Sequence, residues 1–511
     1  QGKAEAMQKN VMEYLEQTVR RVPDKTAYAN ETYGITFRQV YDQSRSVGSF
    51  LHREGYAGEP IVVFMERHPK AIVAFYGVVY AGCYYVPIDE EMPRQRIELI
   101  FQNLKPRAVL CDEKTEKSIE SFPFHGKIYS FEKLIREPAD QQALKGIRDR
   151  QIDMDPVYIV FTSGSTGVPK GVVACHRAVI DYIDNLSGIL RVSEDTVFGN
   201  QTPLYVDACL KELYPTLKFG ATAYLIPKNL FLFPLKLVKF LNDHRINTIC
   251  WVVSALTMIS AFGALEKEVP RFLHTVAFGS EVFPIRQFQI WKEHLPKARF
   301  LNLYGPTEAT GMSCYYEVDR DFSPEETIPI GQPFPNTEIL LLDEHNQIPE
   351  CGREGEICIR GTALALGYYG SFEKTEQSFV QNPLNRVYPE RIYRTGDIGK
   401  YNGRGELVFV SRKDSQIKHM GHRIELGEIE LAAANMEEIR SACVVFDQER
   451  KKIVLCYVGE ATTAQVAQYL KGKLPRYMIP SRIRPLESMP LTPNGKIDRV
   501  LLKEKYATSR K

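Results

Sequence analysis

Short apolar runs alternate with amphipathic stretches along about the first 400 residues of the chain. Runs rich in β-branched and aromatic residues, typical of buried strands, occupy residues 61–66, 83–88, 108–112, 127–131, 248–254 and 275–281. Apolar positions at helical spacing lie between them, as in residues 235–244. Strands that alternate with helices predict an α/β fold of mostly parallel sheets covered by helices on both faces. Ligands of such sheets bind at the carboxyl ends of the strands.

The pattern changes after residue 397. Residues 399–418 combine a glycine-rich turn with a charged strand pair, which we interpret as a linker. Beyond it the sequence predicts a helix from Gly427, strands over residues 441–448 and 451–459, and a helix over residues 463–474. We therefore expect a core domain over residues 1–410 and a small α+β lid over residues 411–511.

Composition and charge exclude several classes of protein. The 511 residues include 65 basic and 63 acidic side chains, without a polybasic tract, so we expect no nucleic-acid or membrane partner. Ten cysteines without a CxxC pair argue against a zinc site and against a disulfide framework, which favours the reducing cytoplasm. The uncharged run over residues 71–88 reaches membrane-span length. Its glycines, proline and tyrosines instead favour a core helix followed by a buried strand.

Residues 158–172, YIVFTSGSTGVPKGV, run from a strand into a loop of Thr, Ser and Gly that ends at a lysine. The glycines allow the backbone to approach a ligand closely, and the hydroxyl groups are hydrogen-bond donors, so the loop suits a phosphate. The spacing is not that of a GxxxxGK[ST] P-loop. The alternatives are an ordinary Ser/Gly-rich surface loop and a solvated lysine. The candidate phosphate-binding residues are Thr162, Ser163, Gly164, Ser165, Thr166, Gly167 and Lys170.

Other segments carry a family resemblance. NLYGPTEAT at residues 302–310, YRTGD at 393–397, SRKDSQIKHMGHRIELGEIE at 411–430 and PLTPNGKIDR at 490–499 follow the first motif in this order. Together they resemble the signature segments of the adenylate-forming superfamily, and most closely the amino acid adenylation domains of nonribosomal peptide synthetases. The resemblance extends to YAGCYYVPID at 80–89, GEICIRGTALALGYYG at 355–370 and LPRYMIP at 474–480, and so covers nearly the whole chain.

The resemblance implies an ATP-dependent ligase that makes an aminoacyl-adenylate and releases pyrophosphate. The acyl group then passes to the phosphopantetheine thiol of a carrier protein. ATP and Mg²⁺ are the implied cofactors, and the enzyme is expected to be a monomer. The implied fold adds a small barrel-like part to the core and makes the lid mobile about a hinge at Asp414. No carrier serine motif follows Arg499, so we expect a carrier that is separate or has been cut away.

The same resemblance assigns roles around the nucleotide. Tyr304 stacks on adenine, Asn302 reaches the base edge, Thr307 binds the α-phosphate and Glu308 ligates Mg²⁺, which prefers one or two carboxylates together with phosphate oxygens. A turn at Gly305-Pro306 is also compatible with this segment. Asp397 and Arg412 are the candidates for binding the ribose. The further nucleotide-binding candidates are Gly279, Gly305 and Lys496.

Three residues are the catalytic candidates by resemblance: Thr162, Lys170 and Lys496. Lys496 lies on a glycine-supported loop near the C-terminus, and it reaches the site only when the lid swings in. There it would bridge the substrate carboxylate and the α-phosphate.

The amino-acid pocket is assigned by counting from the motifs. Asp207 stands where the family places a carboxylate for the α-ammonium. Lys211 would either meet an acidic substrate side chain or turn away toward Glu212, and the apolar lining favours the second orientation with an aliphatic substrate. Phe278 and Leu303 shorten the pocket. The predicted lining is Ala208, Lys211, Cys250, Val276, Phe278, Leu303, Gly311 and Met312, with Lys496 at the carboxylate end.

Three positions depart from the family pattern. Val206 replaces an aromatic residue, Ser411 replaces a glycine, and His419-Met420 replaces an Ile-Arg pair. The open alternatives are a D-alanine–carrier protein ligase, whose pocket we expect to have cysteine at Phe278, and an acyl-CoA synthetase, which Asp207 disfavours. An adenylate-binding scaffold without catalysis is the non-enzyme alternative.

Overall fold

The computed structural model describes residues 7–162, 168–323, 326–413, 416–490 and 497–507. The chain forms two compact units. The first contains residues 1–90, 106–160 and 171–411, and the second contains residues 91–105, 161–170 and 412–511. The predicted division had placed residues 91–105 and 161–170 in the core domain.

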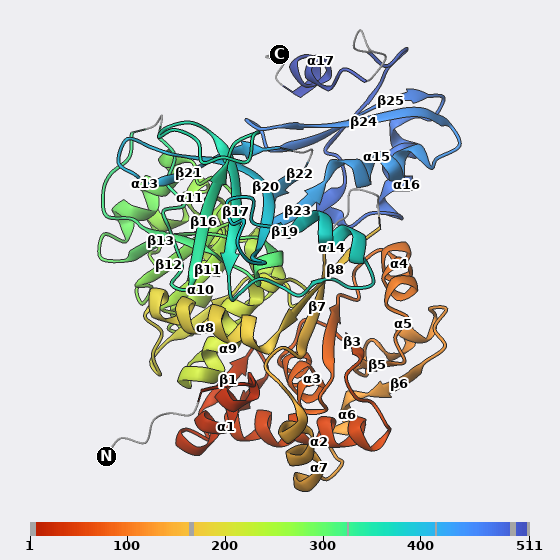
Figure 1. Ribbon diagram of the computed structural model, residues 1–511, viewed down its shortest axis with the longest axis vertical. Coiled ribbons are helices and arrows are strands. Elements are labelled where there is room, and N and C mark those ends of the chain that lie inside the picture. The colour runs from red at the N-terminus through yellow and green to blue at the C-terminus, as the bar shows by residue number, and fades with distance from the viewer. Residues whose placement is uncertain (1–6, 163–167, 324–325, 414–415, 491–496, 508–511) are drawn as a thin grey trace. The chain divides into compact units, whose positions relative to one another are not determined.

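The largest sheet of the first unit has nine strands in the order β15-β14-β13-β12-β11-β9-β10-β1-β2. Its strands β1, β11, β12 and β13 are labelled in Figure 1. Its central strands, from β13 to β1, run parallel, and β2, β14 and β15 are antiparallel additions. The carboxyl ends of β9, β11, β12 and β13 therefore share one edge. The strands are β1 (Thr26–Ala29), β2 (Gly34–Thr36), β9 (Val197–Asn200), β10 (Thr222–Leu225), β11 (Thr248–Val252), β12 (Thr275–Gly279), β13 (Arg299–Tyr304), β14 (Cys314–Glu317) and β15 (Gln332–Pro333).

A second sheet has seven strands in the order β18-β8-β7-β4-β3-β5-β6, and its strands from β7 to β6 are parallel. A third sheet is antiparallel and has five strands, with the order β16-β17-β20-β19 and β21 paired with β20. The strands of the second sheet are β3 (Pro60–Phe64), β4 (Tyr84–Ile88), β5 (Ala108–Cys111), β6 (Lys127–Ser130), β7 (Pro156–Thr162), β8 (Lys170–Cys175) and β18 (Gly367–Tyr368). Those of the third are β16 (Thr337–Leu342), β17 (Gly355–Gly361), β19 (Phe379–Gln381), β20 (Arg391–Tyr401) and β21 (Leu407–Arg412).

Helices cover the parallel sheets and follow the predicted pattern. The uncharged run over residues 71–88 forms a buried helix, α3, and then β4, as expected. The first-unit helices are α1 (Met12–Arg21), α2 (Phe37–Arg53), α3 (Pro69–Tyr80), α5 (Glu116–Glu120), α6 (Phe131–Leu134), α7 (Gln141–Arg150), α8 (His176–Leu190), α9 (Leu210–Phe219), α10 (Pro234–Asp243), α11 (Val253–Ala261), α12 (Ala264–Lys267), α13 (Ile285–His294) and α14 (Phe372–Ser378), with short 3₁₀ turns η1 (Asp207–Cys209), η2 (Lys228–Leu232) and η3 (Thr307–Ala309).

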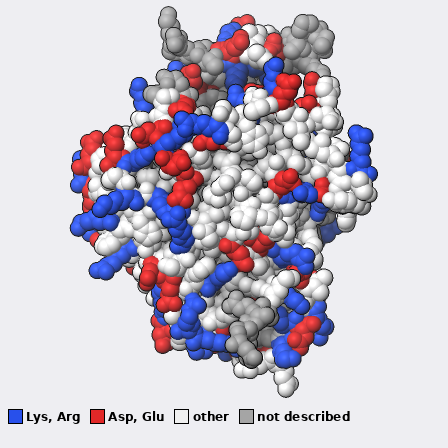
Figure 2. Space-filling model, turned by 60° about the vertical axis from the view of Figure 1, so that its left-hand side comes forward, with Lys and Arg blue, Asp and Glu red and all other residues white. Residues whose placement is uncertain are grey.

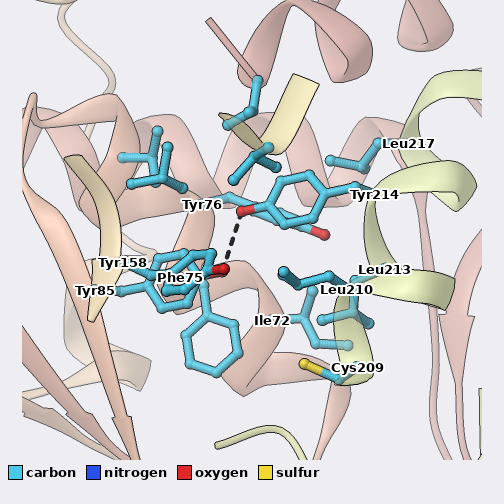
Figure 3. Packing of buried hydrophobic residues seen from close by; sticks show 14 of the residues in the cluster. Ile72, Phe75, Tyr76, Tyr85, Tyr158, Cys209, Leu210, Leu213, Tyr214 and Leu217 are labelled. Carbon is cyan, nitrogen blue, oxygen red and sulfur yellow. Dashed lines mark hydrogen bonds between the residues drawn. The ribbon is translucent and has the colours of Figure 1, made fainter. Parts of the chain in front are cut away.

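A tyrosine-rich cluster packs in the main core (Figure 3). Tyr85 and Tyr214 share a hydrogen bond of 3.1 Å between their hydroxyl oxygens, and Phe75 stacks on Tyr85. Tyr76 shares a 2.7 Å hydrogen bond with the hydroxyl of Tyr28. Buried hydroxyl groups need partners, and pairing them with one another lets large aromatic side chains fill this space.

The second unit is a small α+β structure with its own core. An antiparallel pair, β22-β23, precedes α15, and a three-stranded sheet has the order β24-β25-β26. A buried ion pair of 2.6 Å joins Arg96 of α4 to Glu428 of α15. The elements are α4 (Arg94–Leu104), β22 (Gln416–His419), β23 (His422–Glu425), α15 (Leu426–Ala434), β24 (Ile439–Asp447), β25 (Lys452–Gly459), α16 (Thr463–Lys471), η4 (Arg476–Met478), β26 (Arg482–Pro485), α17 (Arg499–Leu502) and η5 (Lys503–Ala507).

These elements confirm the predicted α/β class, with mostly parallel sheets and a C-terminal α+β part. Among the described residues no helix is long and apolar enough to cross a membrane. All ten cysteines are free thiols, and nine of them are buried. On the face shown in Figure 2, basic and acidic side chains are interspersed around uncharged areas.

Candidate active site

A small cavity lies in the first unit, where neighbouring parallel strands end. The strands β11, β12 and β13 contribute residues at or near their carboxyl ends, and the turn η1 with the start of α9 contributes another side. The lining residues are Thr202, Ala208, Lys211, Cys250, Trp251, Val252, Ala277, Phe278, Gly279, Ser280, Leu303 and Met312. Six of these were predicted as pocket lining, namely Ala208, Lys211, Cys250, Phe278, Leu303 and Met312.

Three other predicted pocket residues lie elsewhere. Val276 is fully buried two residues before Phe278 on β12, and it packs in a core cluster with that residue. Gly311 has φ +141°, and a Cβ there would lie 2.5 Å from the ring of Tyr182. Asp207 lies on η1 beside the cavity and accepts a hydrogen bond from a residue of the NLYGPTE motif.

That residue is Thr307, whose hydroxyl donates a 3.0 Å hydrogen bond to Oδ1 of Asp207. Burial raises the pKa of the Asp207 carboxyl, and the Lys211 ammonium and the Thr307 hydrogen bond oppose this rise. A carboxylate held in such surroundings binds a cation favourably, since the cation offsets the cost of burying the charge. The two residues come from segments 100 positions apart, and they join the amino-acid pocket to the NLYGPTE motif.

Lys211 lies on the first turn of α9, four residues after Asp207. The side chain lines the cavity and only 5 % of the residue is exposed. Glu212, the neighbour toward which an outward side chain would turn, instead accepts a 3.2 Å hydrogen bond from Asn200. The structure therefore corrects the outward orientation that the apolar lining had favoured.

A polar cluster lies behind the cavity. Arg67, between β3 and α3, donates hydrogen bonds to the carbonyls of Thr202, Ile226 and Asn200. Burial raises the pKa of Glu212 to about 8, against the effects of Lys211, Asn200 and Arg67. No sequence motif marks this cluster, because Arg67 lies outside the segments that carry the family resemblance.

Two nucleotide candidates meet at the end of β13. The Tyr304 hydroxyl donates a 2.5 Å hydrogen bond to Oδ2 of Asp397 on β20. Asn302 donates its amide hydrogens to the carbonyls of Pro329 at 2.8 Å and Ile328 at 3.3 Å. Its side-chain oxygen has no hydrogen-bond partner in the described part of the chain and remains available for a donor such as the amino group of a base.

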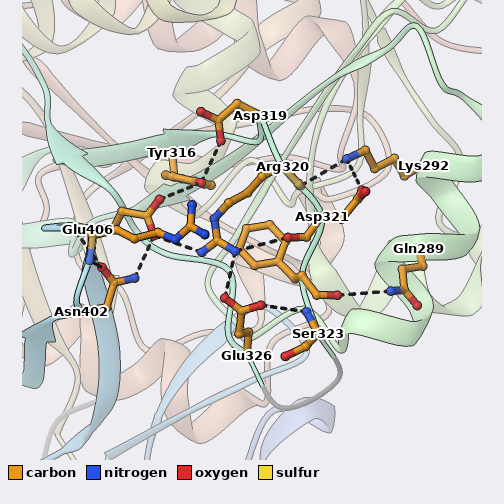
Figure 4. A network of polar contacts seen from close by, with 12 residues as sticks. Gln289, Lys292, Tyr316, Asp319, Arg320, Asp321, Ser323, Glu326, Asn402 and Glu406 are labelled. Atoms are coloured by element: carbon orange, nitrogen blue, oxygen red, sulfur yellow. Dashed lines mark hydrogen bonds and ion pairs between the residues drawn. The ribbon is translucent and has the colours of Figure 1, made fainter.

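An ionic network anchors the segment before Ile328 and Pro329, whose carbonyls accept the hydrogen bonds of Asn302 (Figure 4). Arg320 donates to Glu326 at 2.8 Å and to Glu406 at 3.1 Å. Glu406 also accepts a 2.8 Å hydrogen bond from Asn402 in the turn between β20 and β21. The network links the chain before Ile328 to the hairpin that begins with the strand of Asp397.

Glu308 is fully buried on η3, beside Thr307. Its Oε1 accepts a 2.7 Å hydrogen bond from the Tyr368 hydroxyl. No group of three or more His, Cys, Asp or Glu side chains within the described ranges could hold a metal ion. A single carboxylate fits Mg²⁺ only when phosphate oxygens and water complete the coordination, as this ion prefers.

Glycines shape the NLYGPTE turn. A Cβ on Gly305 would lie 2.1 Å from the carbonyl oxygen of Gly311 and 2.5 Å from Cα of Met312. Gly279 ends β12, and a Cβ there would lie 2.3 Å from the carbonyl oxygen of Leu303. Close backbone approach therefore requires glycine at both positions.

Other predicted site residues lie in the second unit or outside the described residues. Thr162 ends β7, and its hydroxyl is buried without a hydrogen-bond partner among the described atoms. Lys170 begins β8 and Arg412 ends β21. Ser163, Gly164, Ser165, Thr166, Gly167, Asp414 and Lys496 lie outside the described residues.

Five lining residues were missed by counting from the motifs: Thr202, Trp251, Val252, Ala277 and Ser280. Ser280 has φ +69°, which is unusual for a residue with a side chain, and it follows Gly279 in the FGSE segment. Polar residues directly after a predicted parallel strand are the signal that would have identified it.

Comparison with known proteins gives the family of the chain. The model of the AMP-binding enzyme family matches residues 15–369, and that of the AMP-binding enzyme C-terminal domain matches residues 428–496. Tyrocidine synthase 1 of Brevibacillus parabrevis is 31% identical over 510 residues, which are 99% of this chain and 46% of that protein. Bacitracin synthase 1 of Bacillus licheniformis is 30% identical over 507 residues, 98% of this chain and 9% of that protein. The chain thus spans less than half the length of these relatives.

Solved structures agree with the fold. The crystal structure of IdnL1 has a TM-score of 0.82 and 26% identity, and the match covers 95% of this chain and 100% of that one. NpsA-ThdA, an artificially fused adenylation-PCP di-domain from Klebsiella oxytoca, has a TM-score of 0.81 over 95% of each chain. At 22% identity the latter shows the fold alone. Since the first family model covers more than half of the sequence, the chain belongs to the family of AMP-binding, adenylate-forming enzymes.

Proposed function

We propose that the chain activates an amino acid with ATP and then transfers the acyl group to the phosphopantetheine thiol of a carrier protein. The observation that carries the proposal is the 3.0 Å hydrogen bond between Thr307 and Asp207. It brings the residue proposed for the α-phosphate next to the carboxylate proposed for the α-ammonium. An amino acid held at Asp207 has its own carboxylate one bond from the ammonium-bearing carbon, so its reacting oxygen lies near the phosphate.

The first step joins two anions. A carboxylate oxygen of the amino acid attacks the α-phosphorus of ATP, the bond to the β-phosphate oxygen breaks, and pyrophosphate leaves. The Thr307 hydroxyl has one proton, so it donates to the α-phosphate after Asp207 has exchanged it for the ammonium of the substrate. Asp397 accepts from the ribose hydroxyls, and Tyr304 packs on the base. Mg²⁺ at Glu308 would neutralise phosphate charge when bound. Thr162, Lys170, Arg412 and Lys496 are proposed to supply the remaining donors and positive charge.

The second step uses the thiol of the carrier. The sulfur attacks the acyl carbon of the adenylate, a thioester forms, and AMP leaves. The carrier partner is supported by the relatives, because two solved neighbours are described as containing both an adenylation and a PCP domain. We place the reaction in the reducing cytoplasm, where ten free thiols persist, and expect the chain to act as a monomer.

Exchange of labelled pyrophosphate into ATP tests the first step. We expect exchange that depends on an α-amino acid, and we expect Asp207→Ala to lower it at least ~100-fold, since one partner of a buried charge pair is lost. ATP affinity, measured by calorimetry, should stay within about 3-fold. Asp243→Ala, in an exposed pair with Lys239, is the matched control and should behave as wild type.

The panel should contain D-alanine and simple carboxylic acids, and coenzyme A should be offered as an acceptor. Exchange only with acids that lack an amino group would contradict the proposal, and thioester formation on coenzyme A would replace the carrier with a different acceptor. Preferential exchange with D-alanine would identify a D-alanine–carrier protein ligase.

A further inference from the structure

The ammonium group of Lys211 has no hydrogen-bond acceptor among the described residues that surround the cavity. The Nζ atom of Lys211 makes no hydrogen bond or ion pair with any residue in the described part of the chain, although the side chain is buried and lines the cavity. The side chains of Cys250, Phe278, Leu303 and Met312, which line the same space, are apolar or weakly polar. A buried ammonium without an acceptor is strongly unfavourable, so this arrangement calls for an acceptor that the folded chain does not supply.

The neighbouring carboxylates do not supply it. Glu212, the next residue, is hydrogen-bonded to Asn200, and its second oxygen is buried without a partner among the described residues. Asp207 accepts from Thr307. Both carboxylates interact with Lys211 through longer-range electrostatic attraction and not through a hydrogen bond. Asp207 is also already proposed to bind the α-ammonium of the substrate.

We propose that the amino acid activated by this chain carries a carboxylate in its side chain, and that Lys211 binds that carboxylate. The inference rests on the proposed function and names the substrate class of the same site. Asp207 lies on η1, directly before Ala208, which lines the cavity together with Lys211 on the first turn of α9. Asp207 and Lys211 present a negative and a positive charge to one ligand, which matches the ammonium and side-chain carboxylate of an acidic amino acid.

The lining limits the length of the substrate. Phe278 packs against Phe283 with ring centroids 5.0 Å apart, so its ring is fixed and closes part of the cavity. Leu303, on the adjacent strand, is also buried. These side chains favour the short acidic amino acids, aspartate and glutamate, over longer dicarboxylic ones.

Pyrophosphate exchange with the full chain tests the inference. The probes are aspartate, glutamate and 2-aminoadipate, their amides asparagine and glutamine, and alanine, valine and leucine. We expect aspartate or glutamate to give the highest kcat/KM, at least ~30-fold above its own amide, because only the carboxylate pairs with the ammonium.

The variant Lys211→Met keeps the aliphatic stem and removes the charge. We expect kcat/KM for the acidic substrate to fall at least ~100-fold, mainly through KM, while the value for the matching amide stays level or rises. Lys218→Met, on the same helix and paired with Asp184 at the surface, is the matched control and should leave both values unchanged. ATP affinity of each variant, measured by calorimetry, shows that the site is folded.

Two results separate the inference from the proposed function. Exchange that is highest with an aliphatic or amide amino acid, or that is unaffected by Lys211→Met, would overturn the acidic substrate while the amino acid adenylation stands. Absence of exchange with every amino acid, by a chain that still binds ATP, would overturn the proposed function as well.

Discussion

The hydroxyl of Tyr304 donates a 2.5 Å hydrogen bond to the carboxylate of Asp397, across 93 positions of the sequence. Both residues are buried, with 4 % and 2 % of their surfaces exposed. Burial, together with the negative charge of Asp397, raises the pKa of Tyr304 well above its ordinary value, so the phenol remains a donor at all physiological pH values. The phenol thus occupies one of the two oxygens that a ribose diol would need.

This relationship predicts that two conservative substitutions affect the ATP affinity to different degrees. Asp397→Asn removes the acceptor proposed for the ribose hydroxyls and should weaken ATP binding roughly 10- to 100-fold, the range of one or two charge-assisted hydrogen bonds. Tyr304→Phe keeps the aromatic face and removes only the phenol hydroxyl from the carboxylate, so the ATP affinity should stay within about 3-fold. Calorimetric titration with ATP compares them, and equal losses in both variants would show that the phenol itself contacts the nucleotide.

The fold was accessible from the sequence because its signals are local. The run over residues 71–88 forms α3 and β4, and the runs at 248–254 and 275–281 form β11 and β12, because β-branched residues between turn-forming residues specify strands over short distances. The order of the strands in the sheets was not accessible. The pairing of β1 with β10, for example, joins residues 28 and 223, and no local pattern encodes it.

Lys496 lies outside the described residues, and its role stays a prediction. Lys496→Ala should leave ATP binding nearly intact and lower pyrophosphate exchange by roughly two to three orders of magnitude, the effect of removing one preorganised charge. Transfer from preformed adenylate to the carrier should fall much less. Single-turnover assays of each half-reaction make the comparison, and an equal loss in both would assign Lys496 a structural role.

The hinge proposed at Asp414, outside the described residues, is tested by restricting its backbone. Asp414→Pro fixes φ near −65° and should trap the arrangement that makes the adenylate, because a hinge residue must absorb a large change of dihedral angles. Pyrophosphate exchange should survive, and the rate of carrier loading should fall. Normal loading by this variant would place the hinge at another residue.

A pair of glycine substitutions tests the NLYGPTE turn. Gly305→Ala should destabilise the first unit by more than about 1 kcal/mol and abolish exchange, since the new methyl group would lie 2.1 Å from a backbone oxygen. Gly188→Ala, on the exposed side of α8 with open space around it, should instead raise stability by about 0.5–1 kcal/mol. Urea unfolding gives both values, and a tolerated Gly305→Ala would mean that the turn relaxes.

The candidate site was only partly accessible from the sequence. Counting from motifs located Ala208, Cys250 and Leu303, because parallel strands bring motif ends to one edge. Counting could not orient Lys211, because the neighbours of a side chain are set by the fold, and Glu212 is hydrogen-bonded to Asn200. It also placed Val276 in the lining, although strand alternation puts this residue deeper on the face of Phe278, inside the core.

Part of the cavity wall comes from three adjacent parallel strands, which contribute among others Cys250 on β11, Phe278 on β12 and Leu303 on β13. The ladder that joins these strands is made by backbone groups, so exchanging one of the three side chains leaves the sheet's hydrogen bonds unchanged. A change of one of these side chains therefore reshapes the pocket without altering the pairing of the strands. Diversification of the pocket is therefore separated from the maintenance of the scaffold.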